Sequence, residues 1–388
     1  MSTVFRAAGA HDLLALVPAL AGFRPERSIV CVAFAGSRSV GVLRHDLPRR
    51  ARDRPAVVTA IIGTLCRMPG VDAVVPIAYT DRSFAERGGP PERGLLALVA
   101  RRAAEAGFTV RDLLCRATDA WGSMLDPETP SCGHPLSAIE QSALAAAALP
   151  GGQPGPQEAG AELAVPDLKL AAEIAELLDA LADPERVEAV LERLGEDADP
   201  VTLVEALVDR PVAGHPPLRL AWFVHLADHP SVRDAMMLQF AFGRLIGEAA
   251  LVDAETSLEV PGDDVDVRGS DDGLDELLGR LLVGQSSLRP DTARVERALE
   301  LFRAMIPNVP AALRAGPLCI AAWLAWSLGR GSVAGALLEQ ARAVAPGHTM
   351  TSLLSSFVGS GALPEWAFSP SASGGAETDR GSDGKRVQ

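Results

Sequence analysis

One stretch of the chain, residues 12–48, does most to restrict the folds that are open to it. It reads DLLALVPALAGFRPERSIVCVAFAGSRSVGVLRHDLP. Apolar residues recur at helical spacing from Leu13 to Leu20, and Asp12 before them is a suitable N-cap for a helix. The β-branched run 28–35 predicts a buried strand, and a Gly-Ser-Arg turn leads to an alternating run that ends at Pro48. A helix and an antiparallel pair of strands therefore begin the fold.

The next residues alternate between helical and extended patterns. Residues 56–68 predict an amphipathic helix, residues 71–79 a second buried strand, residues 94–107 a helix and residues 109–117 a third long strand. Residues 121–125 predict a short strand paired with the third. This alternation predicts an α/β domain with a mixed sheet and flanking helices. The chain has neither a G-x-G-x-x-G fingerprint after a strand nor a P-loop motif.

Composition divides the chain into parts. We assign residues 1–150 to the α/β domain and the Gly- and Pro-rich residues 151–166 to a flexible linker. The period is helical from residue 167 to residue 368, which predicts an all-α domain. Within it, residues 253–276 are interpreted as an acidic loop. Residues 369–388 have almost no apolar content and predict a disordered tail.

Two features of the helical part bear on its architecture. The apolar pattern predicts one unbroken helix over residues 231–251. Farther on, Ala322, Ala334 and Ala341 fall where a tetratricopeptide repeat places its small residues, and Pro346 where it places its closing proline. Only one such unit is visible, and solenoids need about three repeats for stability. We therefore expect a tetratricopeptide-like helical hairpin inside a larger helical domain, with a peptide groove as a hypothesis.

Several stretches together resemble one known family. DLLALVPALAGFRPERSIVCVAF, RHDLP at 44–48 and YTD at 79–81 are similar to its N-terminal features, and SVRDAMML and AAWLAWSLGRGSVAGALLEQARAVAPGH to its helical part. Over most of residues 11–366 the chain is thus similar to the actinobacterial family known as domain-of-unknown-function family 4192. The resemblance implies this two-part architecture and an intracellular location, but no activity. Where relatives carry a Cys-rich segment, residues 126–135 keep only Cys132.

Polar residues at the predicted strand ends form the candidate site. Arg44 and Asp46 lie two apart at the end of one strand, Tyr79 and Asp81 lie two apart at the end of the next, and Trp121 follows the third. Ligands of open α/β sheets bind beyond the carboxyl ends of parallel strands. Convergence of these ends would build a crevice suited to an anionic or nucleotide-like ligand. The alternative is an Arg–Asp surface pair beside a partly buried tyrosine.

Two other patterns favour structural explanations. His225 and His229 have the i, i+4 spacing of zinc proteases, but the glutamate that should follow the first histidine is missing. Residues 264–275 begin like a calcium loop, but Arg268 occupies the fifth position. We predict a helix end for the first and a solvated acidic loop for the second. No metal site, cofactor or catalytic motif is predicted.

Charge is distributed unevenly along the chain. Residues 1–150 hold 17 Arg against 14 Asp and Glu, a net charge of +3, whereas the remainder carries −17 of the total of −14. The acidic part would repel phosphates, and the arginine run at 44–54 lacks interleaved aromatic residues for stacking bases. A nucleic-acid partner is therefore not favoured. No apolar run approaches the roughly 18 residues of a membrane span.

Two functions fit these observations. The five cysteines are scattered without a disulfide or zinc pattern, which indicates a reducing cytoplasm. The first hypothesis is a non-enzymatic cytoplasmic interaction or regulatory protein whose helical domain engages another protein. The second is an α/β domain that binds or transforms a small anionic or nucleotide-like ligand at its strand ends.

Overall fold

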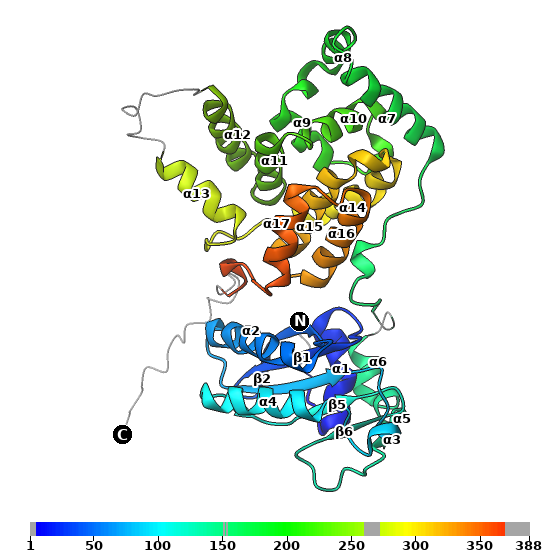
Figure 1. The fold of residues 1–388 in the computed structure, drawn as a ribbon, viewed down its shortest axis with the longest axis vertical. Helices are drawn as coiled ribbons and strands as arrows, with labels where there is room; N and C mark the ends of the chain where they lie inside the picture. The colour runs from blue at the N-terminus through cyan, green and yellow to red at the C-terminus, as the bar shows by residue number, and fades with distance from the viewer. Residues whose placement is uncertain (1–4, 150–151, 153, 260–271, 369–388) are drawn as a thin grey trace, which may run out of the picture.

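A computed structural model describes residues 5–149, 152, 154–259 and 272–368, and it places an α/β domain next to a helical domain (Figure 1). The prediction of an α/β domain with a mixed sheet, followed by a helical region, is confirmed. The strands are β1 (Ser28–Ala35), β2 (Arg38–Asp46), β3 (Ala73–Tyr79), β4 (Thr109–Val110), β5 (Leu114–Arg116), β6 (Ala120–Ser123) and β7 (His134–Pro135).

The described strands form one sheet in the order β2-β1-β3-β5-β6-β7, and β4 also pairs with β3. β1 is antiparallel to both β2 and β3, whereas β3 is parallel to β4 and β5. β5, β6 and β7 follow one another in antiparallel pairs. The parallel pairing requires a crossover connection, and the helix α4 (Arg93–Glu105) supplies it between β3 and β4.

Helices cover both faces of the sheet. Alternate residues of β1 point to opposite sides: Ile29 and Cys31 join the apolar cluster beneath the two helices of one face, while Val30 and Val32 join the cluster beneath those of the other. Burial on both faces explains why residues 28–35 form a continuous apolar run. The first pair is α2 (Arg54–Arg67) and α4, and the second face carries α1 (Ala10–Ala21), α5 (Ser137–Glu140) and α6 (Ala143–Ala148).

The prediction of one long third strand was wrong. β4 ends at Val110 and β5 begins at Leu114. Between them, the Asp112 carboxylate accepts hydrogen bonds from the Leu113 N–H, at 2.7 Å, and from the Ser123 hydroxyl. A side chain that bonds its own local backbone competes with the ladder of a sheet, which accounts for the interruption.

The helical domain packs around a core rich in aromatic side chains. Phe223, Phe240 and Phe302 meet with ring centroids 5.3–5.9 Å apart, and all three are fully buried.

No helix in the described part of the chain combines the length and apolar character that a membrane crossing requires. The helices are α7 (Leu168–Leu181), α8 (Val187–Leu194), α9 (Pro200–Val208), α10 (Pro217–Leu226), α11 (Pro230–Phe242), α12 (Arg244–Glu259), α13 (Asp272–Leu282), α14 (Thr292–Met305), α15 (Ala315–Ser327), α16 (Gly331–Val344) and α17 (Thr349–Gly359).

Two predictions for this domain need correction. The helix expected over residues 231–251 is broken at Gly243, whose φ of 88° ends α11 before α12 begins. The acidic loop expected at 253–276 is helical at both ends, because α12 continues to Glu259 and α13 starts at Asp272. The helical patterns of α12 and α13 continue into the charged segment. The high density of acidic residues there had suggested a loop. The expected disordered tail, 369–388, lies outside the described residues.

Where the sequence predicts a tetratricopeptide-like hairpin, the structure has the helices α15 and α16, which pack against each other. Ala322, Ala334 and Ala341 are fully buried, as close approach of two helices requires. Every residue of α15 is also buried. This helix therefore has no free face with which to line a peptide groove of the repeat type.

Residues 154–166, which composition assigns to a flexible linker, contact both domains. On the sheet side, the Arg24 N–H donates to the Gly155 carbonyl at 2.9 Å. On the helical side, the Gln340 amide donates to the carbonyl of Ala161 at 2.9 Å, and Ala161 is buried. The segment thus has defined hydrogen bonds at both ends and forms one wall between the domains.

Candidate functional site

The two strand ends singled out by the sequence lie at one edge of the sheet. Ser28, the first residue of β1, pairs with Asp46 at the end of β2 and with Tyr79 at the end of β3. The ends of β2 and β3 are therefore separated only by the start of β1. A cleft of about 1860 Å³ lies at this edge, between the sheet and the helical domain.

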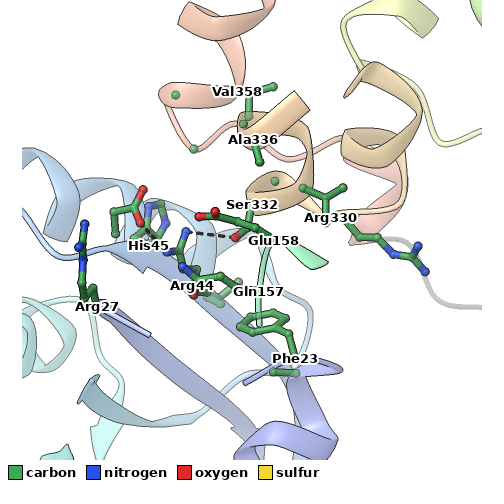
Figure 2. Close-up of a pocket in the computed structure, with 18 of the residues that line it drawn as sticks. Phe23, Arg27, Arg44, His45, Gln157, Glu158, Arg330, Ser332, Ala336 and Val358 are labelled. Carbon is green, nitrogen blue, oxygen red and sulfur yellow. Dashed lines mark hydrogen bonds and ion pairs between the residues drawn. The ribbon is translucent and has the colours of Figure 1, made fainter. Parts of the chain in front are cut away.

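The cleft has three walls, which Figure 2 shows in close-up. The end of β2 and the loops after α1 and β3 form the sheet wall, and residues 155–160 form the second. The helix α16, together with α17, forms the third. A site that takes walls from both domains is a common setting for ligand binding.

Arg44 lies at the centre of the cleft. Its side chain is only 11% exposed, and Nη1 donates to the Ser332 hydroxyl of α16 at 3.1 Å. Nη2 pairs with the Asp46 carboxylate on the same face of β2. The Nε atom is buried without a hydrogen-bond partner among the described residues. The guanidinium therefore joins the two domains and keeps donor capacity that protein groups do not use.

Asp46 and Asp81 also line the cleft, and both are exposed. Asp81 follows the end of β3 and lies 3.7 Å from the Arg27 guanidinium. The structure thus brings together Arg44, Asp46 and Asp81, as the strand-end hypothesis requires. It adds Arg27, from the turn that precedes β1.

Tyr79 and Trp121 lie elsewhere. Both are buried in the cluster beneath α1, together with Leu14 and Val17, and neither lines the cleft. The reason is the position at which β3 ends. Tyr79 is still within β3 and its side chain points to the α1 face, whereas Asp81 lies beyond the strand. Burial raises the pKa of the Tyr79 phenol, although the neighbouring Arg116 opposes this.

A row of polar residues crosses the sheet beneath α1. Register places Asp46, Ser28, Tyr79, Arg116, Trp121 and His134 opposite one another in succession. Three buried atoms of this row, the Ser28 Oγ, the Tyr79 hydroxyl and the Trp121 Nε1, have no hydrogen-bond partner among the described residues. Such atoms reduce stability unless water reaches them.

His45, next to Arg44, is a functional candidate that sequence reasoning missed. It lines the cleft and is half-buried, with its ring against the backbone of Gly361. Burial lowers the pKa of the imidazole, and the Arg44 charge lowers it further, against an opposing effect of Asp46. The neutral ring can accept a proton or a hydrogen bond from a ligand.

The other missed residues come from segments that carried no recognisable signal. Phe23 belongs to the turn after α1, Gln157 and Glu158 to the Gly- and Pro-rich segment, and Arg330 and Ser332 to the start of α16. The Gly-Phe-Arg-Pro sequence was visible as a turn, but nothing in it indicated a cleft. Only the packing of distant segments joins these residues.

The structure describes one of the two metal-like patterns of the sequence in full. His225 lies in the last turn of α10 and His229 directly precedes α11, so no single helix carries both, although their ring centroids are 5.1 Å apart. Within the described residues, no three His, Cys, Asp or Glu side chains gather as metal ligands. Most of the calcium-like stretch, residues 264–271, lies outside the residues that the structure describes.

Comparison with known proteins places the chain in a family. Neither the curated proteins nor the solved structures contain a match to the chain. A family model does match, over residues 11–251 and 285–365, and so covers most of both domains. The resemblance noted in the sequence is thereby confirmed. The chain belongs to the family described as "Domain of unknown function (DUF4192)".

Proposed function

We propose that this protein binds a small anionic ligand in the cleft between its two domains. The observation that carries the proposal is the position of Arg44. Its guanidinium is almost buried, contacts Asp46 on the sheet wall and Ser332 on α16, and has N–H groups on Nη1 and Nη2 beyond those two contacts. An arginine in such a setting suits planar recognition of a carboxylate or phosphate.

The charges around Arg44 also favour an anion. Six arginines line the cleft against five carboxylates, but four of these carboxylates already pair with arginine. Arg49 makes no ion pair or hydrogen bond among the described residues. Each guanidinium has five donors, so pairing with one carboxylate leaves others available. The lining therefore has more donors than the protein itself satisfies.

The size and openness of the site fit a ligand that fills part of it. Typical small-molecule pockets measure about 300–1,000 Å³, so a cleft of about 1860 Å³ would also hold ordered water. Because the walls come from both domains, a bound ligand would add contacts between them. A ligand that binds only the folded protein should raise the unfolding temperature, and the rise should grow with the logarithm of the ligand concentration above Kd.

The test is calorimetric titration of the full-length chain with pyrophosphate, ribose 5-phosphate, AMP and citrate. We expect at least one anion to bind, and the Arg44→Gln variant to bind it roughly tenfold or more weakly, because a charged hydrogen-bond donor is lost. Arg102→Gln is the matched control, since Arg102 is exposed on α4 and pairs with Glu105. Equal affinity in Arg44→Gln and wild type, or no binding by any anion, would refute the proposal.

An interaction with another protein is a second candidate. It is supported by exposed apolar side chains on neighbouring helices of the helical domain: Leu245 is 80% exposed and Val252 60% exposed on α12, and Leu277 is 44% exposed on α13. Affinity capture with wild type and Leu245→Asp would test it. A partner retained by wild type and lost by the variant is expected; equal recovery by both would exclude this surface.

A further inference from the structure

The geometry points to a nucleotide-type ligand, in which a heteroaromatic ring stacks on Phe23 while the anionic group meets Arg44. This inference rests on the proposed function and adds the chemical class of the ligand. Binding of such a ligand requires an aromatic platform, polar groups that could contact the edge of a ring, and a cation within the same cleft. Phe23, the pair Gln157 and Glu158, and Arg44 supply these parts.

Phe23 is the unusual element. It lies in the turn that ends α1 at Gly22, and it lines the cleft as a half-buried side chain. It belongs to none of the three apolar clusters among the described residues, and its ring stacks on no aromatic ring or guanidinium of those residues. By contrast, the rings of Phe34 and Phe368 are each covered by a guanidinium. The ring of Phe23 therefore lies outside the described apolar cores and lines the cleft.

The segment beside Phe23 is held in place by backbone contacts. Arg24, the next residue, forms an isolated parallel bridge with Pro156. The Glu26 N–H donates to the Gln157 Oε1 at 3.3 Å, which fixes the amide and leaves its NH₂ group as a donor. Figure 2 shows Phe23 and Gln157 on the same side of the cleft as Arg44.

Glu158 lies on the same wall and is exposed, and its carboxylate makes no hydrogen bond or ion pair with the other described residues. An amide donor and a carboxylate acceptor on consecutive residues match the donor and acceptor pattern at the edge of a nucleobase. A flat ring on Phe23 would present that edge to the segment. Its phosphate could then reach Arg44, which already contacts Ser332 across the cleft.

The test compares AMP and GMP with ribose 5-phosphate by calorimetric titration of the full-length wild type, Phe23→Ala and Phe23→Tyr. In the wild type we expect the nucleotides to bind roughly tenfold or more tightly than ribose 5-phosphate, because base–aromatic stacking contributes on that scale. Phe23→Ala should remove this preference while leaving the affinity for ribose 5-phosphate unchanged. Phe23→Tyr should retain the preference, since its ring can still stack.

The two levels of the proposal fail differently. Equal affinity for the nucleotides and ribose 5-phosphate in the wild type, or a preference that survives in Phe23→Ala, would overturn the nucleotide inference and leave anion binding intact. Absence of binding by every anion would overturn both. Thermal unfolding of each variant is the folding control, and Phe23→Ala should unfold near the wild-type temperature because the ring lies outside the cores.

Discussion

The Nη1 atom of Arg44 donates to the Oγ atom of Ser332 at 3.1 Å, although the two residues are 288 positions apart. Arg44 lies near the end of β2, and Ser332 lies in the first turn of α16. Their contact crosses the cleft and is part of what holds the domains together. It also gives a direct means to measure the coupling between the two domains in solution.

A double-mutant cycle with Arg44→Met and Ser332→Ala should measure this contact. We expect a coupling free energy of about 0.5–1.5 kcal/mol, since a hydrogen bond of this kind exchanges with water on unfolding. Chemical denaturation of the four proteins gives the values. The same cycle in an Asp46→Asn background controls for the neighbouring ion pair. A coupling free energy of zero would show that the two side chains do not meet.

Replacing Tyr79 with Phe should leave the protein equally stable or make it more stable, by about 1 kcal/mol. The hydroxyl is buried and has no hydrogen-bond partner among the described residues, so removing it relieves a desolvation cost. Tyr79→Ala, in contrast, should cost about 3–5 kcal/mol through the cavity it leaves. Urea unfolding of the three proteins provides the comparison. Marked destabilisation by Tyr79→Phe would indicate a partner for the hydroxyl, such as bound water.

Stability should fall with acidification, and His45 should contribute to the fall. Burial and the Arg44 charge lower its pKa in the folded state below the ordinary 6.5. Between the lowered pKa of the folded state and the ordinary pKa of the unfolded state, the unfolded chain binds more protons at His45. The contribution of His45 to stability is therefore fully present above pH 6.5 and decreases below it. His45→Gln should weaken this dependence. The measurement is the unfolding free energy from pH 7.5 to 5; His215, His225 and His348, whose pKa values are also lowered, leave a residual slope in the variant.

Gly361→Ala should destabilise the protein more than Gly329→Ala. Both glycines have positive φ, 75° and 77°, so each alanine carries about 1–2 kcal/mol of backbone strain. Only at Gly361 would the added Cβ also lie 2.7 Å from the His45 ring; at Gly329 it meets nothing within 4 Å.

Denaturation midpoints of the two glycine variants would show the difference. Combining His45→Ala with Gly361→Ala should remove the extra loss of stability seen for Gly361→Ala, because the obstructing ring is then gone. If the two glycine variants were equally stable, the contact between His45 and the segment around Gly361 would be disproved.

Sequence patterns were sufficient where each residue's environment depends on its near neighbours in the chain. Continuous apolar runs predicted β1 and β3 because both faces of these strands are covered. They failed where a local side chain or glycine interrupts the pattern. Asp112 divides the third predicted strand, and Gly243 divides a long apolar helix.

The candidate site was accessible to the sequence only in part. Arg44, Asp46 and Asp81 could be named because strand ends are polar and converge at one edge of a sheet. Tyr79 and Trp121 were assigned to the same crevice, but the structure places them in the core. The direction of a side chain at a strand end depends on where the strand stops, and a shift of one residue reverses the face.

The sequence by itself determined the two-part architecture and the family, because hydrophobic periodicity and turn residues act over a few positions along the chain. Tertiary structure alone decided the cleft. Phe23, Gln157 and Ser332 lie in three segments that have no common pattern, and they face the same space only because two cores pack side by side. Contacts between such distant residues depend on the packing of whole domains, which no local pattern encodes.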